Sequence, residues 1–143
     1  MPNMIIERGI SGFGGAVTAP HHLAAQAGGR VLSDGGNAIE AMIAAAACIA
    51  VVYPHMNGLG GDNVWLIHAG RGSQPVGFDA CGAAAGLADA QWYRASGHEQ
   101  MPPRGPKAAS TVAGSVSGWG TAYEWSSRPG GGQSEGQPGG EEG

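Results

Sequence analysis

The hydrophobic and polar positions predict a short strand and then a helix at the start of the chain. Val17 and Thr18 favour a pleated surface, so residues 14–20 are predicted as a strand that ends at Pro20. Over residues 20–33, hydrophobic side chains recur at the spacing of one helical face. The side chains that we expect this helix to bury are Leu23, Ala24, Ala27, Val31 and Leu32.

Two glycine pairs accompany this helix. Gly28 and Gly29 lie inside it, where each glycine weakens a helix by up to about 1 kcal/mol relative to alanine. We therefore expect them to mark close packing against a neighbouring element. Gly35 and Gly36 suit the left-handed conformation in which many helices end.

A second helix is predicted directly afterwards. Asn37 and Glu40 stand three residues apart, as the two members of a capping box do. Residues 41–52 contain no charged side chain, and a helix that is apolar on all sides is typical of a buried position. Pro54 ends this helix, because the residue before a proline avoids the helical region.

A glycine-rich corner at residues 57–61 leads into two strands, predicted at residues 63–70 and 74–80 and joined as an antiparallel pair. Neither this corner nor the earlier GFGGAV stretch has the Gly-Lys-Ser/Thr ending of a phosphate-binding loop. The corner also follows a helix and opens a strand, which reverses the order of a dinucleotide fingerprint. A tight turn is sufficient to explain these glycines.

Further along, residues 86–97 are predicted as an amphipathic helix, residues 101–106 as a loop, and residues 110–125 as a short strand, a turn and a helix. The side chains expected to anchor the amphipathic helix are Leu87, Trp92 and Tyr93.

The chain therefore divides into an irregular lead-in at residues 1–13, an α/β region at residues 14–127 and a low-complexity tail at residues 128–143. The tail contains no hydrophobic residue, so it cannot offset the entropy lost on ordering. We predict that the tail is disordered, and that the chain is cut off or continued in a foreign reading frame near residue 128.

Composition and charge exclude several classes of function. Charged residues make up 13% of the 143 residues, about half the usual share, and the formal net charge is -4. No basic cluster indicates binding to nucleic acid or to an anionic membrane. Residues 41–52 are shorter than the roughly 18 apolar residues of a spanning helix, and the residues MPNMIIERGISG do not have the pattern that we expect of a secretory signal. We expect a cytoplasmic protein.

Candidate chemistry is sparse. The histidines lack the spacing of a metal site, Cys48 is typical of a small core residue, and no cofactor motif is found, so we predict neither metal nor cofactor. No Gly-x-Ser-x-Gly elbow is present. Asp62 and Asp79 are expected to flank different ends of the two strands and hence not to form a pair. The residues alone therefore indicate no self-contained catalytic set.

Several ordered stretches do, however, resemble a known family. Residues 18–67, which run from TAPHHLAAQAGG through GGNAIEA to YPHMNGLGGDNVWLI, are similar to the start of the γ-glutamyltransferase (γ-glutamyltranspeptidase) family. Residues 110–119, STVAGSVSGW, resemble a later Val-Pro-Gly-x-x-x-Gly segment of the family, although Ala113 stands where proline is usual. Within the family, the sequence looks most like the oxamate amidohydrolase branch.

The resemblance implies an αββα N-terminal-nucleophile hydrolase fold, of which this chain carries the first part of the large subunit. It also implies a proenzyme that cleaves itself and exposes a threonine, which attacks a small amide or γ-glutamyl substrate with its own α-amine as base. Thr18, Thr111 and Thr121 do not match the setting of that nucleophile. The chain alone is therefore expected to be inactive, and its implied partners are the remainder of the large subunit and the small subunit.

Cys81 stands where glutamyl-specific members of the family have an arginine that grips the α-carboxylate of the substrate. A cysteine lacks the bidentate fork of a guanidinium, so the resemblance leaves glutamyl specificity open. As a substrate contact, Cys81 competes with a simpler role as a small residue in a strand-end turn. Two further alternatives remain for the chain as a whole, an inactive truncated or frame-shifted remnant and a small binding module.

Overall fold

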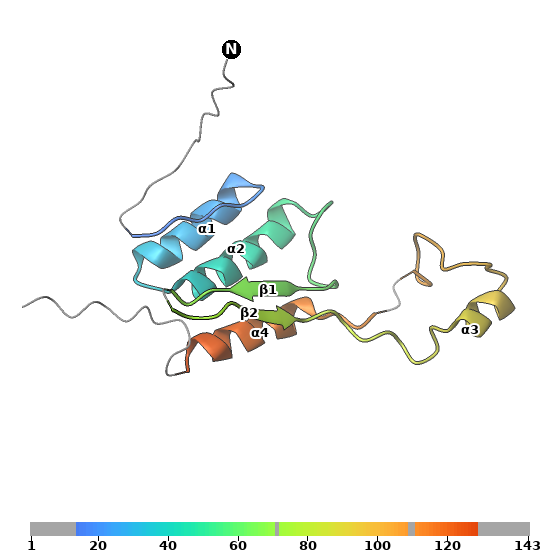
Figure 1. Ribbon diagram of the computed structural model, residues 1–143. Coiled ribbons are helices and arrows are strands. Elements are labelled where there is room, and N and C mark those ends of the chain that lie inside the picture. Colours follow the sequence, from blue (N-terminus) through green and yellow to red (C-terminus); the bar gives the residue numbers. More distant parts are fainter. Residues whose placement is uncertain (1–13, 71, 109–110, 129–143) are drawn as a thin grey trace, which may run out of the picture. The chain divides into compact units, whose positions relative to one another are not determined.

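The computed structural model describes residues 14–70, 72–108 and 111–128, and the predicted lead-in and nearly all of the predicted tail lie outside these residues. The chain divides into two compact units between Asn57 and Gly58, and Figure 1 labels the elements of each. The first contains α1 (His22–Ser33) and α2 (Ala38–Val52). The second contains β1 (Val64–Ile67), β2 (Val76–Asp79), α3 (Ala90–Ala95) and α4 (Ser115–Ser126). Among the described residues, no helix has the length and apolar character that a membrane crossing requires.

The turn between α1 and α2 forms as its polar and glycine residues predict. Gly35 has a φ of 91°, and the Gly36 N–H donates to the Val31 carbonyl at 2.8 Å, which closes the end of α1. Asn37 Oδ1 then accepts from the backbone N–H of Glu40 at 3.0 Å, while Glu40 Oε2 accepts from the Asn37 N–H at 2.8 Å. The predicted capping box and glycine helix end are both confirmed.

The two helices approach each other closely at Gly28. A Cβ at this position would lie 2.7 Å from the carbonyl oxygen of Ala41 and 2.9 Å from Cγ1 of Val17. A Cβ at Gly29 would meet nothing within 4 Å. The close packing expected of the glycine pair is therefore confirmed for Gly28 and wrong for Gly29. The buried residues of this unit are Ala24, Gly28, Ile39, Ala41 and Ala45.

Three expectations for the first unit are wrong. Residues 14–20 have no regular secondary structure, because no described segment pairs with them as a strand. Leu23, expected in the buried stripe of α1, is 43% exposed, since small residues form the contact with α2. Helix α2 is not buried on all sides, and Val51 is 76% exposed. Helix α1 packs against α2, and the exposed residues of α2 are Ala38, Met42, Ala47 and Val51.

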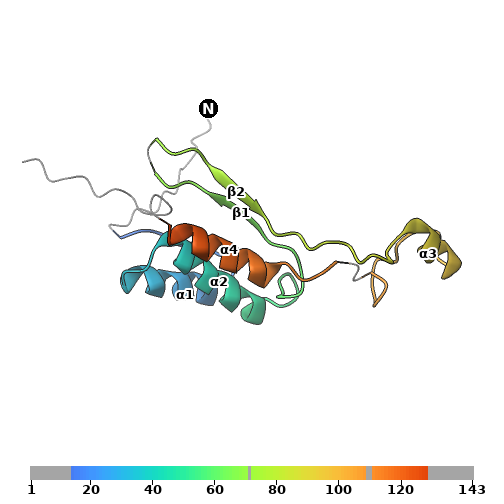
Figure 2. The same ribbon diagram turned by 90° about the horizontal axis from the view of Figure 1, so that it is seen from below.

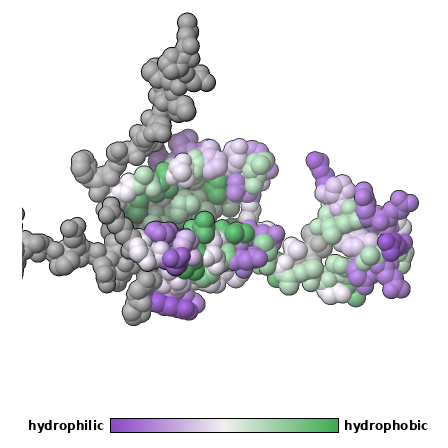
Figure 3. Space-filling model, viewed as in Figure 1, coloured by the Kyte–Doolittle hydropathy of each residue, from purple (hydrophilic) through white to green (hydrophobic). Residues whose placement is uncertain are grey.

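The second unit is built on the predicted hairpin. β1 and β2 pair antiparallel, with Val64 opposite Asp79 and Ile67 opposite Val76. Helix α4 runs beside this hairpin (Figure 2), and Phe78 meets Trp125 edge-to-face at 6.2 Å between ring centroids. Successive side chains of a strand alternate between faces, so Val64 and Leu66 point the other way. They are 73% and 81% exposed, and Figure 3 shows hydrophobic surface over the hairpin.

Helix α3 is shorter than the predicted segment of residues 86–97. The side chain of Asp89 accepts from the Trp92 N–H at 2.7 Å and so starts the helix late. Gly97, with a φ of 81°, follows its end. Of the three predicted anchors, Tyr93 is buried and donates its hydroxyl to the Lys107 carbonyl at 2.7 Å, whereas Trp92 is 37% and Leu87 is 73% exposed.

Candidate functional site

The candidate site is the end of the hairpin at which β1 begins and β2 ends. Val64 opposes Asp79, and beyond this pair the Ala80 N–H donates to the Asn63 carbonyl at 2.8 Å. Asp62 and Asp79 therefore flank the same end of the two strands, and the expectation of different ends is wrong. The reason is geometric, because an antiparallel partner reverses direction and returns its last residue to the start of the first strand. Cys81 lies two residues after Asp79, at this same end of the hairpin.

Both aspartates hold the Cys81 loop, residues 80–84, which follows β2. Asp79 Oδ1 accepts from the Cys81 backbone N–H at 2.9 Å, and Asp62 Oδ1 accepts from the Gly82 N–H at 3.0 Å. Each carboxylate thus satisfies one backbone donor of a turn that has few ladder bonds of its own. The side chain of Cys81 is exposed.

The thiol of Cys81 is held in its neutral form. Its hydrogen bond to the Asp79 carboxylate is the main cause that raises its pKa from the ordinary value of 9.0 to about 11. Smaller contributions come from loss of hydration and from the negative charges of Asp79 and Asp62. The same contact, together with the Cys81 backbone N–H, lowers the pKa of Asp79. At neutral pH the described part of the site therefore holds a neutral thiol, hydrogen-bonded to the carboxylate of Asp79 and near that of Asp62.

Three glycines allow the start of α4 to reach this loop. A Cβ on Gly82 would collide with the carbonyl of Val112, and one on Gly114 with the carbonyl of Ala80. A Cβ on Gly118 would lie 2.7 Å from Cβ of Ala80. Backbone meets backbone at Gly82 and Gly114, and Gly118 meets the Ala80 side chain, so these glycines are required by the packing between the loop and the helix.

Sequence reasoning missed Ser115, the first residue of α4. It is 3% exposed, and the single hydrogen of its hydroxyl is shared between the carbonyls of Gly61 at 2.9 Å and Asp62 at 3.2 Å. The N–H groups of Gly114 and Ser115 reach the same Gly61 carbonyl, both at 3.0 Å. The one available signal was a serine directly after Gly114, in a segment with family resemblance.

The remaining candidate residues do not assemble a catalytic or metal site. Thr121 bonds within α4, to the Ser117 carbonyl at 3.1 Å, and Thr111 is exposed. His21 caps α1 by accepting from the Leu23 N–H at 3.2 Å. In the described part of the chain, no three histidine, cysteine or acidic side chains gather as metal ligands. Cys48 is half-buried in α2, so it is not one of the fully buried core residues that the sequence led us to expect.

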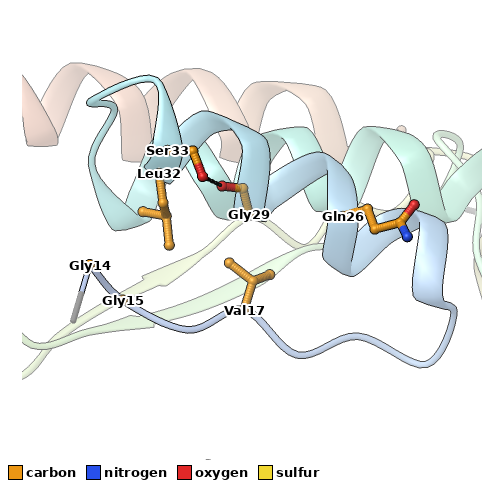
Figure 4. A pocket seen from close by; sticks show the side chains of 7 residues that line it. All are labelled: Gly14, Gly15, Val17, Gln26, Gly29, Leu32 and Ser33. Carbon is orange, nitrogen blue, oxygen red and sulfur yellow. Dashed lines mark hydrogen bonds between the residues drawn. The ribbon is translucent and has the colours of Figure 1, made fainter. Parts of the chain in front are cut away.

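A groove of about 510 Å³ lies in the first unit, between residues 14–17 and α1 (Figure 4). Its polar side chains are Gln26 and Ser33, and the hydroxyl of Ser33 is already bonded to the Gly29 carbonyl at 3.0 Å. Among the described residues that line it there is no titratable side chain, so these residues offer no group for acid–base chemistry. The lining residues are Gly14, Gly15, Val17, Gln26, Gly29, Leu32 and Ser33.

Sequence comparisons show which known proteins the chain is similar to. Residues 24–128 match the family model described as gamma-glutamyltranspeptidase. The oxamate amidohydrolase proenzyme of Klebsiella pneumoniae subsp. pneumoniae is 59% identical over 73% of this chain and 19% of its own length. The glutathione hydrolase-like YwrD proenzyme of Bacillus subtilis is 40% identical over 80% of this chain and 21% of its own length. The chain thus spans about a fifth of these relatives.

A solved structure agrees with the sequence comparisons. The gamma-glutamyltranspeptidase from Pseudomonas nitroreducens, complexed with L-DON, superposes with a TM-score of 0.68 at 30% identity. The match covers 80% of this chain and 34% of that one. The predicted fold class is confirmed, in that the described helices and hairpin form part of the α/β fold of these N-terminal-nucleophile hydrolases.

Proposed function

Because the chain belongs to the gamma-glutamyltranspeptidase family, we propose that it is the N-terminal part of the large subunit of a self-cleaving amide hydrolase. The observation that carries this proposal is the 59% identity to an oxamate amidohydrolase proenzyme over most of the chain. The proposed partners are the rest of the large subunit and the small subunit, whose N-terminal threonine would supply the nucleophile. We also propose that the protein works in the cytoplasm.

We further propose that the substrate is a small amide such as oxamate, in preference to a γ-glutamyl compound. The support comes from the loop end at Cys81, the position that the family resemblance matches to the carboxylate-binding arginine. A neutral thiol at this position offers no guanidinium fork to the α-carboxylate of a γ-glutamyl group, so that end of the larger substrate gains no ion pair here. In this proposal Cys81 is a specificity position and takes no part in bond cleavage.

The test uses the whole enzyme that contains this segment, assayed with oxamate and with glutathione. We expect kcat/KM to favour oxamate, and we expect Cys81→Arg to raise kcat/KM for glutathione mainly through a lower KM. Cys81→Ser serves as the matched control, because it keeps the size and adds no charge. A wild-type preference for glutathione would refute the proposed substrate class.

A second test concerns this chain by itself. The purified chain is expected to hydrolyse neither oxamate nor a γ-glutamyl anilide, since no threonine in it matches the family's nucleophile. Turnover that survives re-purification and disappears in Thr111→Ala would refute the assignment of the nucleophile to the partner subunit. Thr121→Ala, on an exposed face of α4, is the control substitution.

A further inference from the structure

Ser115 joins two parts of the second unit that lie more than 50 residues apart in sequence. Its buried hydroxyl is within hydrogen-bonding distance of the Gly61 and Asp62 carbonyls, and its own N–H donates to Gly61. We propose that Ser115 is a positioning residue that fixes the loop of Cys81, and through it the substrate contact at that loop. This inference rests on the proposed function for the substrate contact, although the positioning itself rests on the contacts alone.

The connection from Ser115 to Cys81 runs through Asp62. The hydroxyl of Ser115 holds the peptide carbonyl of Asp62 at 3.2 Å, and the carboxylate of Asp62 holds the Gly82 N–H at 3.0 Å. Gly82 is the direct neighbour of Cys81. A shift of the Asp62 backbone therefore moves the carboxylate that restrains the far side of the Cys81 loop.

The other side of the loop is restrained by the segment that precedes α4. The Val112 N–H donates to the Ala83 carbonyl at 3.0 Å, and Ala84 forms an isolated antiparallel bridge with Thr111. The loop thus lies between the Asp62 segment on one side and the Val112 segment on the other. Ser115 belongs to the second segment and bonds to the first, so it sets the spacing between the two restraints.

Other serines of α4 make no such connection and so provide matched controls. Ser126 is also buried, at 7% exposure, but its hydroxyl donates to the Tyr123 carbonyl of its own helix at 2.7 Å. Ser117 donates to the Gly114 carbonyl at 2.8 Å. Replacement of Ser126 by alanine removes a buried hydroxyl of the same kind without touching the loop.

The experiment follows the alkylation of Cys81 by iodoacetamide as a function of pH, with peptide-resolved mass spectrometry to separate Cys81 from Cys48. In Ser115→Ala we expect a small fall in the midpoint of the pH profile, because the negative charge of Asp62 moves away from the thiol while the larger contribution, the hydrogen bond to Asp79, remains. Ser115→Thr keeps the hydroxyl and should restore the parent profile, and Ser126→Ala should leave it unchanged. Asp62→Asn should lower the midpoint independently of any effect on α4.

A parent-like profile in Ser115→Ala would overturn the proposal, as would an equal shift in Ser126→Ala, which would indicate general loosening of the helix. Ser115→Ala could lose its helical circular dichroism, in which case its pH profile is not used. The test then rests on the midpoints of Ser115→Thr and Asp62→Asn. A parent-like midpoint in Asp62→Asn overturns the proposal. Alkylation of Cys81 does not depend on catalytic turnover. Failure of the proposed function would instead appear as a preference of the whole enzyme for glutathione, so the two failures can be told apart.

Discussion

Substitution of Gly28 by alanine should loosen the α1–α2 pair, whereas the same substitution at Gly29 should stabilise it. Both glycines lie inside α1, so each replacement gains about 1 kcal/mol of helix propensity. The two differ in their surroundings, because the new Cβ at Gly28 would lie 2.7 Å from the Ala41 carbonyl oxygen. At Gly29 the new Cβ would meet nothing within 4 Å. The comparison therefore isolates the contact between the helices.

The magnitude follows from the distance. An ordinary contact of a Cβ begins near 3.4 Å, so α1 and α2 must separate by several tenths of an ångström, or Val17 and the Ala41 peptide must shift. Overpacking of this kind costs about 1–3 kcal/mol, and the neighbour that must yield at Ala41 is backbone. Since the propensity gains cancel, the two variants should differ by about 1–3 kcal/mol in the free energy of opening.

Hydrogen exchange of the α1 and α2 amides, read by mass spectrometry, measures this difference without requiring a single cooperative transition. We expect amides of α2 near Ala41 to exchange roughly 5- to 150-fold faster in Gly28→Ala than in Gly29→Ala. Gly28→Ser should follow Gly28→Ala, because it adds the same Cβ. Equal protection in the two alanine variants would show that α1 and α2 do not pack through Gly28.

Three further predictions concern the thiol, the open face of the hairpin and the second helix. At pH 8, with a pKa of about 11, Cys81 should react with iodoacetamide about 10-fold more slowly than an ordinary thiol, since a roughly 100-fold smaller thiolate fraction is partly offset by higher nucleophilicity. Asp79→Asn should remove most of this difference, and a rate in the parent chain equal to that of a free cysteine would contradict the pKa. The chain should bind a hydrophobic dye at the exposed side chains of Val64 and Leu66. The double variant Val64→Thr, Leu66→Thr should bind less dye and keep its helical circular dichroism, because threonine suits a strand. Unchanged dye fluorescence in this variant would show that the dye binds elsewhere. Asn37→Ala should weaken α2 by about 1 kcal/mol, because the helix loses its cap. Ser33→Ala is the control, and the measurement is the hydrogen-exchange protection of the α2 amides. Equal protection in the two variants would argue against the capping box.

The elements that local signals specify were predictable from the sequence. Asn37, Glu40 and Pro54 mark the ends of α2 by interactions within a few residues, and the hairpin follows from two β-rich runs around a turn. The end of the hairpin that gathers Asp62 and Asp79 was also within reach, because an antiparallel pair implies it. Residues 14–20 were predicted wrongly as a strand, since strand propensity acts only where a partner strand supplies hydrogen bonds.

The contacts that shape the candidate site could not be read from local pattern. Gly82 and Gly114 are 32 residues apart, and their need to be glycine arises from the backbone that each meets across the loop. Ser115 looks like any polar residue at a helix start until Gly61 and Asp62 are brought beside it. Such pairings depend on how distant segments fold together, and one sequence does not reveal which segments meet.

The hairpin has a further consequence for assembly. In the described residues β1 and β2 form a two-stranded sheet, so each strand is paired along one side only. Along the other side of each strand, outward-pointing N–H and C=O groups form an open ladder that another strand can join without breaking any existing bond. The sheet can therefore grow outward from both sides at once. The same property that lets added strands complete it also lets exposed copies associate edge to edge at high protein concentration.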